Sequence, residues 1–129
     1  MTAYEAWNGG DAIRARAPHV LDVYQETRDT VLKSGIVERE LKELCVRYLA
    51  EDEDVVRHAD DPSRYDGRQR AALAWADAIA WDSARADDSL WSRLHSAFTE
   101  PELVELGYTI AFMLGQQHWL ATHGVAELS

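Results

Sequence analysis

The spacing of apolar residues is the feature that most narrows the folds open to this 129-residue chain. Helical spacing recurs along almost the whole sequence, whereas no segment alternates apolar and polar residues for long enough to build a sheet. The clearest example lies in residues 38–50, where apolar side chains recur every three or four positions: Leu41, Leu44, Cys45, Tyr48 and Leu49. The chain is therefore predicted to be all-α.

Start and stop signals locate the expected helices. Asp66 is a suitable N-cap, Thr99 and Glu102 can form a capping box, and Pro18 suits a first helical turn. The last expected helix is apolar nearly all round, which predicts burial in a core and at a subunit interface. The expected helices cover residues 18–33, 38–50, 55–59, 67–81, about 88–98 and 100–122.

Length and charge limit the classes of protein. We expect one domain over residues 1–129, with residues 1–10 as a loosely held arm. The net charge of -10 argues against nucleic acid as a partner, because binding it needs clustered lysine and arginine. No apolar run approaches the ~20 residues that span a bilayer, so no membrane partner is expected. The first residues lack the apolar stretch of a signal peptide, so a cytoplasmic location is expected.

Three segments carry a resemblance to a known family. They are ERELKELCVRYLA, GRQRAALAWADAI and FTEPELVELGYTIAFMLGQQHWLATHGV. Relatives show the same order: a helix with a Lys-Glu-Leu start, a redox or polar segment, an Arg-Ala-Ala-Leu-Ala helix, and a helix with a Glu-(Leu/Ile)-Val-Glu-Leu core. From about Leu21 to Val125 the chain resembles the carboxymuconolactone decarboxylase and alkylhydroperoxidase-D (AhpD-like) family.

The resemblance implies an all-α subunit that assembles into trimers or hexamers, and it implies which chemistry is missing. The redox branch of the family carries Cys-x-x-Cys, whose positions correspond here to Val55 and His58. The motif's own histidine corresponds to Pro62. A catalytic disulfide needs two cysteines, and the only cysteine in the sequence is Cys45. The non-redox decarboxylase branch also lacks the cysteine pair, so the chain is similar to that branch.

Two candidates for acid–base chemistry follow from this alignment. His58 falls on the segment that carries chemistry in relatives, and an imidazole titrates near neutral pH. The other interpretation is that His58 belongs to a solvated surface turn. Glu43 corresponds to the acidic residue that assists the redox motif in relatives. It can equally be half of a surface ion pair with Arg47, four positions along the same helix.

The last expected helix supplies further candidates. Gln116, Gln117 and His118 interrupt an apolar helix, so they are expected to line a pocket or a polar subunit junction. We take His118 as a third acid–base candidate and Gln117 as a ligand-binding candidate, together with the hydroxyl of Tyr48. His118 and His123 lie five positions apart and do not share a helix face, so no metal site is expected. No cofactor is expected either.

The sequence thus leads to three functional hypotheses. The first is a non-redox or degenerate family member that acts on a small organic acid or lactone by acid–base chemistry. The second is a non-catalytic, oligomeric ligand-binding or interaction protein on the same scaffold. The third is a one-cysteine peroxidase that uses Cys45; this residue lies on an apolar helix stripe, where thiols are usually inert.

Overall fold

The computed structural model describes residues 10–124, and within them every regular element is helical. This confirms the all-α prediction. The elements are α2 (Asp11–Arg14), α3 (Pro18–Lys33), α4 (Arg39–Leu49), α5 (Glu53–His58), α6 (Gly67–Trp81), the 3-10 helix η1 (Ser83–Arg85), α7 (Asp88–Ala97) and α8 (Glu100–Thr122). No helix of the described ranges is long and apolar enough to cross a membrane.

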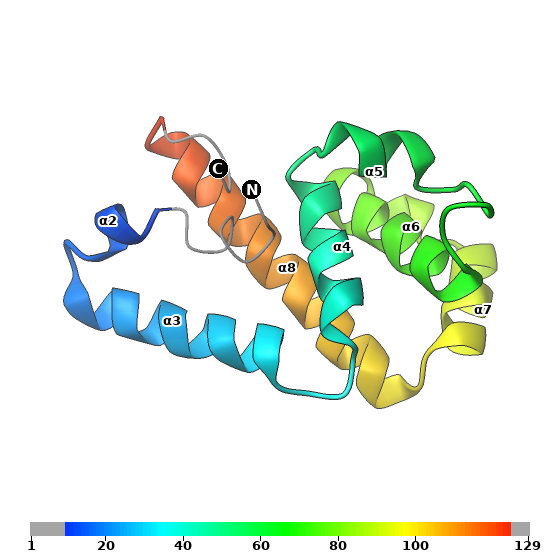
Figure 1. The fold of residues 1–129 in the computed structure, drawn as a ribbon, viewed down its shortest axis with the longest axis horizontal. Helices are drawn as coiled ribbons and strands as arrows, with labels where there is room; N and C mark the ends of the chain where they lie inside the picture. The colour runs from blue at the N-terminus through cyan, green and yellow to red at the C-terminus, as the bar shows by residue number, and fades with distance from the viewer. Residues whose placement is uncertain (1–9, 125–129) are drawn as a thin grey trace.

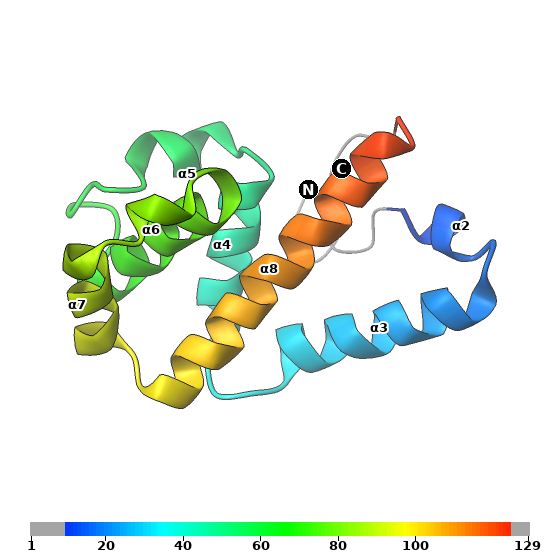
Figure 2. The ribbon, with the colours of Figure 1, turned by 180° about the vertical axis from the view of Figure 1, so that it is seen from behind.

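Helices α4, α6, α7 and α8 pack together, and α3 extends away from them (Figure 1). Seen from behind, α8 runs diagonally between the α4–α7 group on one side and the α2–α3 segment on the other (Figure 2). The contacts among α4, α6, α7 and α8 are far more extensive than those that α3 makes. The main core therefore lies on one side of α8.

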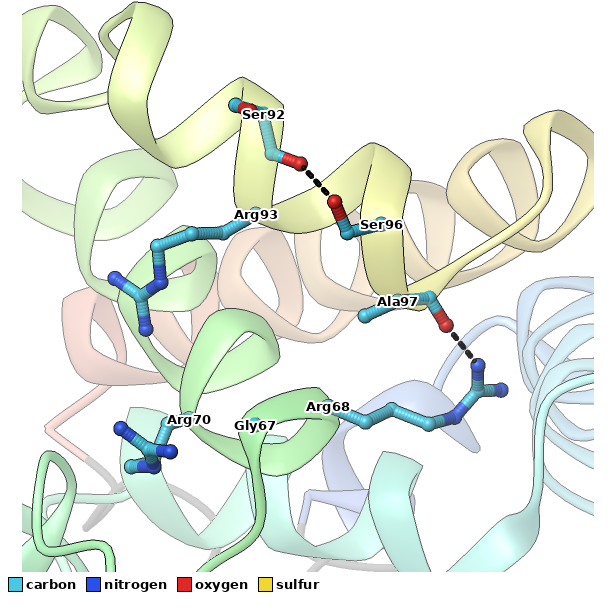
Figure 3. A pocket seen from close by; sticks show the side chains of 7 residues that line it. All are labelled: Gly67, Arg68, Arg70, Ser92, Arg93, Ser96 and Ala97. Atoms are coloured by element: carbon cyan, nitrogen blue, oxygen red, sulfur yellow. Dashed lines mark hydrogen bonds between the residues drawn. The ribbon is translucent and has the colours of Figure 1, made fainter.

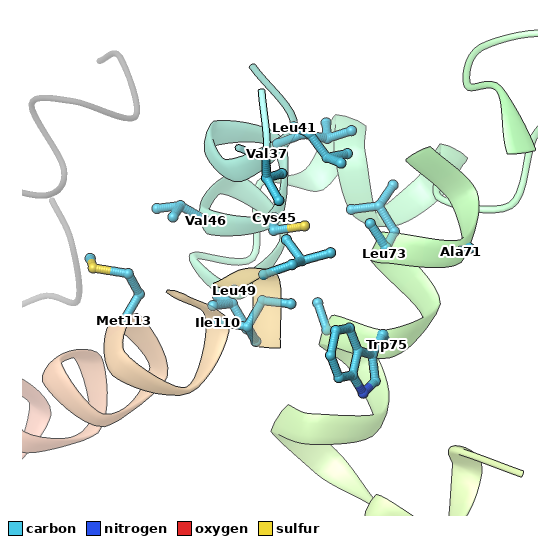
Figure 4. Close-up of a cluster of buried hydrophobic side chains, with 14 of the residues drawn as sticks. Val37, Leu41, Cys45, Val46, Leu49, Ala71, Leu73, Trp75, Ile110 and Met113 are labelled. Atoms are coloured by element: carbon cyan, nitrogen blue, oxygen red, sulfur yellow. The ribbon is translucent and has the colours of Figure 1, made fainter. Parts of the chain in front are cut away.

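That core is built by the predicted apolar stripe of α4 (Figure 4). Leu41, Cys45 and Leu49 of this stripe are buried against α6 and α8. Helix α6 contributes alanines that allow close packing, and Gly107 of α8 does the same: a Cβ there would come within 2.7 Å of the Trp75 ring. Small residues thus set the distance between α6 and α8.

The predicted helix ends are confirmed to within one or two residues. The Asp66 side chain accepts a hydrogen bond from the Gln69 amide, and the Gln69 side chain completes a capping box at the start of α6. Thr99 and Glu102 form the second capping box, at the start of α8. Each box satisfies amide groups that no helical carbonyl reaches.

The outer part of α3 leaves apolar side chains exposed. Tyr24 and Val31 are buried, but Val20 and Val23 are 41% and 60% exposed. The reason is the position of α3, which contacts α8 and α4 only sparsely. A short helix that the sequence analysis missed, α2, precedes it and packs against it.

A buried ion pair joins the α3–α4 connection to α8. Lys42 is fully buried, and its ammonium group lies 3.1 Å from a Glu105 carboxylate oxygen and donates to the Ser34 carbonyl. The same carboxylate accepts hydrogen bonds from the amides of Ile36 and Val37. Burial acts to raise the pKa of Glu105, but these hydrogen bonds and the lysine outweigh it and lower the pKa.

A second cluster, centred on Arg68 of α6, ties three helix ends together. Its guanidinium makes two hydrogen bonds to Glu38 before α4, at 2.7 and 3.0 Å, and one to Glu102 of α8 at 2.6 Å. It also donates to the Ala97 carbonyl at the end of α7 and lies over the ring of Phe98. One arginine therefore holds the starts of α4 and α8 against α6.

This cluster predicts a loss of stability in acid. Hydrogen bonds from Arg68 and from the Thr99 amide lower the pKa of Glu102 to about 2, from an ordinary 4.5. Because the folded pKa is depressed, the stabilisation is complete above pH 4.5 and is lost as the pH falls from there to about 2. Glu102→Gln should flatten the fall of the urea midpoint across this range. Glu53→Gln, at an exposed pair with Arg57, is the control for net charge and should leave that fall as steep as in the parent.

Candidate functional site

A hollow of about 460 Å³ lies between the start of α6 and the outer face of α7 (Figure 3). No carboxylate of the described residues 10–124 lines it, although the chain as a whole carries a net charge of -10. Two of its arginines, Arg70 and Arg93, extend to the same side, whereas Arg68 points away toward the Ala97 carbonyl (Figure 3). The lining residues are Gly67, Arg68, Arg70, Ser92, Arg93, Ser96 and Ala97.

Arg70 and Arg93 keep most of their hydrogen-bonding capacity. Within residues 10–124, neither makes an ion pair with a carboxylate, and Arg93 makes no hydrogen bond. Arg70 donates only from Nε, to the Tyr65 carbonyl at 3.2 Å. Each guanidinium offers five N–H donors in a fixed plane that matches carboxylate and phosphate oxygens. Two such groups lining the same hollow favour an oxyanion.

The same two arginines line a second hollow, of about 330 Å³, between α6 and the end of α5. Tyr48 and Asp77 also line this second hollow, so the phenol, the carboxylate and both guanidinium groups border the same space. We call the two adjoining hollows the arginine groove. The second hollow is lined by Tyr48, Ala59, Asp60, Arg70, Leu73, Ala74, Asp77 and Arg93.

Tyr48 and Asp77 form a hydrogen-bonded pair within the arginine groove. The Tyr48 hydroxyl donates to Asp77 Oδ1 at 2.7 Å, and Arg85 of η1 donates to Asp77 Oδ2 at 2.6 Å. Burial, followed by the hydrogen bond and the charge of Asp77, raises the pKa of Tyr48 well above its usual range. The phenol is thus neutral at physiological pH and serves as a hydrogen-bonding group.

Tyr48 also lines a third hollow. This space of about 350 Å³ is bounded by Val56 and Arg57 of α5 and by Trp81 at the end of α6. The Trp81 side chain is 63% exposed. The predicted ligand-binding residue Tyr48 therefore lines two hollows.

The three residues predicted for acid–base chemistry lie on three separate helices. His58 of α5 is partly exposed, and its Nδ1 lies 2.9 Å from the Asp54 carbonyl oxygen and 3.3 Å from the Asp54 carboxylate. Glu43 of α4 pairs with Arg39 at 3.0 Å, not with Arg47. His118 of α8 is exposed. None of the three lines the arginine groove.

Gln117, the other predicted ligand-binding residue, faces the core. Its side-chain nitrogen donates to the Leu49 carbonyl at 2.7 Å and so caps the end of α4. Its carbonyl oxygen is buried without a hydrogen-bond partner in the described part of the chain. Its neighbour Gln116 instead accepts hydrogen bonds from Arg14 at the edge of a separate apolar hollow of about 410 Å³ between α3 and α8.

Cys45 is 1% exposed within the α4 stripe, and burial raises the pKa of its thiol to about 12. Since the thiolate is the reactive form, we expect Cys45 to resist alkylation by iodoacetamide in the folded protein at neutral pH. The same thiol should react fully in denaturing guanidinium chloride. Mass spectrometry under both conditions makes the comparison. Alkylation of the folded protein at the rate of a free cysteine would contradict this assignment.

The described residues contain no group of three or more histidine, cysteine or carboxylate side chains arranged to hold a metal ion. Comparison with known proteins finds no matching family model, no matching curated protein and no matching solved structure.

The sequence analysis did not single out Arg70, Arg93 or Asp77. One signal was available: the segment RYDGRQR places three arginines within seven residues of an acidic chain. Arg68 forms ion pairs with Glu38 and Glu102, and Arg70 forms none within residues 10–124. This difference depends on how α4 and α8 pack against α6. The approach of Arg93 from α7 depends on the fold alone.

Proposed function

We propose that the chain binds a small organic acid in the arginine groove and acts on it by proton transfer. The observation that carries this proposal is that Arg70 and Arg93, which make no ion pair within residues 10–124, line the same hollow as the Tyr48–Asp77 pair. The guanidinium groups hold the carboxylate of the ligand by charge-assisted hydrogen bonds. They thereby direct the rest of the ligand toward the phenol and carboxylate.

Two carboxylates line the groove, Asp60 and Asp77, and Asp77 is the one that the Tyr48 hydroxyl holds in place to take a proton. A carboxylate near a bound acid can serve as general base if it lies within hydrogen-bonding reach of the proton. The neutral Tyr48 hydroxyl donates a hydrogen bond to Asp77 and fixes its orientation. Arg85 donates to the second carboxylate oxygen of Asp77 and so helps to fix the same orientation. The acid–base roles of His58, Glu43 and His118 stay predictions, since none of them lines this groove.

The proposal includes the AhpD-like fold and a homo-oligomer, as expected for the non-redox branch of the carboxymuconolactone decarboxylase-like family. The burial of Cys45 supports that branch over a peroxidase. Trimers or hexamers are the proposed assemblies.

A binding protein without catalysis is the second candidate, and one observation favours it. Both oxygens of Asp77 already accept hydrogen bonds, from Tyr48 and Arg85. A carboxylate so engaged has fewer free lone pairs to offer a proton of the ligand. The groove would then retain its ligand without turning it over.

The test has two steps, binding and proton exchange. Thermal shift and calorimetry with benzoate, succinate and neutral benzamide ask whether the groove selects anions. A ligand that binds and carries an acidic C–H bond is then followed by NMR in D2O. Exchange that disappears in Asp77→Asn supports the enzyme, and binding without exchange supports the second candidate. Failure of both carboxylates to bind better than benzamide removes the proposal.

A further inference from the structure

The two hollows of the arginine groove differ in the charges that border them. The first hollow, at the start of α6, is lined by arginines and serines and by no carboxylate of residues 10–124. The second hollow is bordered by Arg70 and Arg93 as well, and it adds the carboxylates of Asp60 and Asp77. The groove therefore has a positive end and an end where both signs of charge are present.

Asp60 is the carboxylate of the groove whose charge is not balanced by a partner. It lies two residues after the end of α5, and its side chain makes no ion pair or hydrogen bond within residues 10–124. Asp77, by contrast, is held by the Tyr48 hydroxyl and by the Arg85 guanidinium, whose positive charge balances its own. The Asp60 side chain is exposed, so a ligand reaches it directly from solvent.

Opposite charges thus border the second hollow without pairing with one another. A guanidinium and a carboxylate in contact form strong, often paired hydrogen bonds, yet neither Arg70 nor Arg93 forms an ion pair with Asp60. The space of about 330 Å³ that they line falls in the range of about 300–1,000 Å³ that is usual for small-molecule sites. A ligand with a carboxylate alone would leave Asp60 unpaired and would be repelled by it.

Tyr48 adds a second acceptor at this end of the groove. Its hydroxyl donates its proton to Asp77 at 2.7 Å, so the oxygen keeps lone pairs that can accept from a ligand. An ammonium group has three N–H donors and no acceptor, which suits such an environment. Ala59, Leu73 and Ala74 line the same hollow and provide apolar contacts for methylene groups.

We infer that the ligand of the arginine groove is an amino acid, held with its carboxylate on Arg70 and Arg93 and its ammonium group on Asp60. The distribution of charge sets the direction of the ligand: the carboxylate lies where the two hollows adjoin, and the ammonium group lies in the second hollow. The inference rests on the proposed function, because it names the class of organic acid that the groove takes.

Matched pairs of ligands test this class. Glycine, β-alanine, γ-aminobutyrate and ε-aminohexanoate are titrated into the full chain and compared with acetate, propionate, butyrate and hexanoate. At least one amino acid should bind about tenfold more tightly than the acid of the same length, the gain that one charge-assisted hydrogen bond provides. The four lengths cover the range of spacings between the two charges. If no amino acid binds more tightly than its matched acid, the inference is overturned.

Asp60→Asn should reverse this preference. The amide no longer pairs with the ammonium group, so the best amino acid should bind about tenfold more weakly, and the matched acid should bind more tightly because a repelling charge is gone. The variant should unfold at the temperature of the parent, since Asp60 makes no side-chain contact that the substitution breaks. Asp22→Asn, at an exposed position of α3, removes an equal charge and should change neither affinity.

The outcomes separate this inference from the proposed function when benzoate is titrated into the same samples. An advantage of the amino acid that persists in Asp60→Asn, or that is lost equally in Asp22→Asn, would overturn the inference. Benzoate binding without any advantage of an amino acid overturns the inference alone. The absence of binding by benzoate and by every amino acid removes the proposed function as well.

Discussion

Replacing Arg93 by glutamine is expected to weaken the binding of benzoate by about 10- to 100-fold. The substitution removes charge-assisted hydrogen bonds, each worth about 1.5–3 kcal/mol, and every 1.4 kcal/mol corresponds to a factor of ten. Arg70→Gln should have a similar effect, because both guanidinium groups line both hollows of the arginine groove. Isothermal titration calorimetry on each variant and on the double variant measures the losses.

Stability should hardly change in these variants, since neither arginine takes part in an ion pair within residues 10–124. Arg57→Gln is the matched control: it removes an equal charge from an exposed pair with Glu53 and should keep the parent affinity. Equal losses in Arg57→Gln and Arg93→Gln would mean that only the overall charge of the protein matters. That result would contradict a built oxyanion site.

Glu105→Ala should destabilise the fold by about 3–5 kcal/mol, the usual cost of removing one partner of a buried ion pair. The substitution leaves the fully buried Lys42 ammonium without its carboxylate, and it removes the acceptor for the Ile36 and Val37 amides. Chemical denaturation followed by circular dichroism measures the loss of unfolding free energy.

Glu43→Ala provides the comparison, because it also removes a helical glutamate from an ion pair. Its partner Arg39 is 47% exposed, so the pair is worth at most about 1 kcal/mol. Similar losses in the two variants would show that Lys42 finds another partner or water. The double variant Lys42→Met with Glu105→Ala should recover part of the stability, since it removes the unpaired charge.

The helices could be predicted from the sequence because their determinants are local. Apolar spacing located α4, and the caps Asp66 and Thr99 marked the starts of α6 and α8 within a residue. The short α2 was missed because four residues carry almost no periodicity. The exposure of Val23 could not be foreseen either, since it depends on how few contacts α3 makes with the other helices.

The site was harder to predict because its determinants are not local. Tyr48 was chosen as a hydrogen-bond donor, and the structure places it in the arginine groove. Gln117 was chosen as a polar break in an apolar helix, but it satisfies a helix end in the core. The two residues differ in their hydrogen-bond partners: Tyr48 donates to Asp77, whereas Gln117 donates to the Leu49 carbonyl. Neither partner is close in sequence.

The most direct test of the central claim is an NMR titration of the labelled protein with benzoate, with benzamide as the neutral control. The account predicts that benzoate shifts the side-chain Nε–H signals of Arg70 and Arg93, along with the backbone amides of Ser92 and Ser96. Benzamide should leave them in place. Shifts confined to the apolar hollow between α3 and α8, or identical shifts with both compounds, would contradict an oxyanion site in the arginine groove.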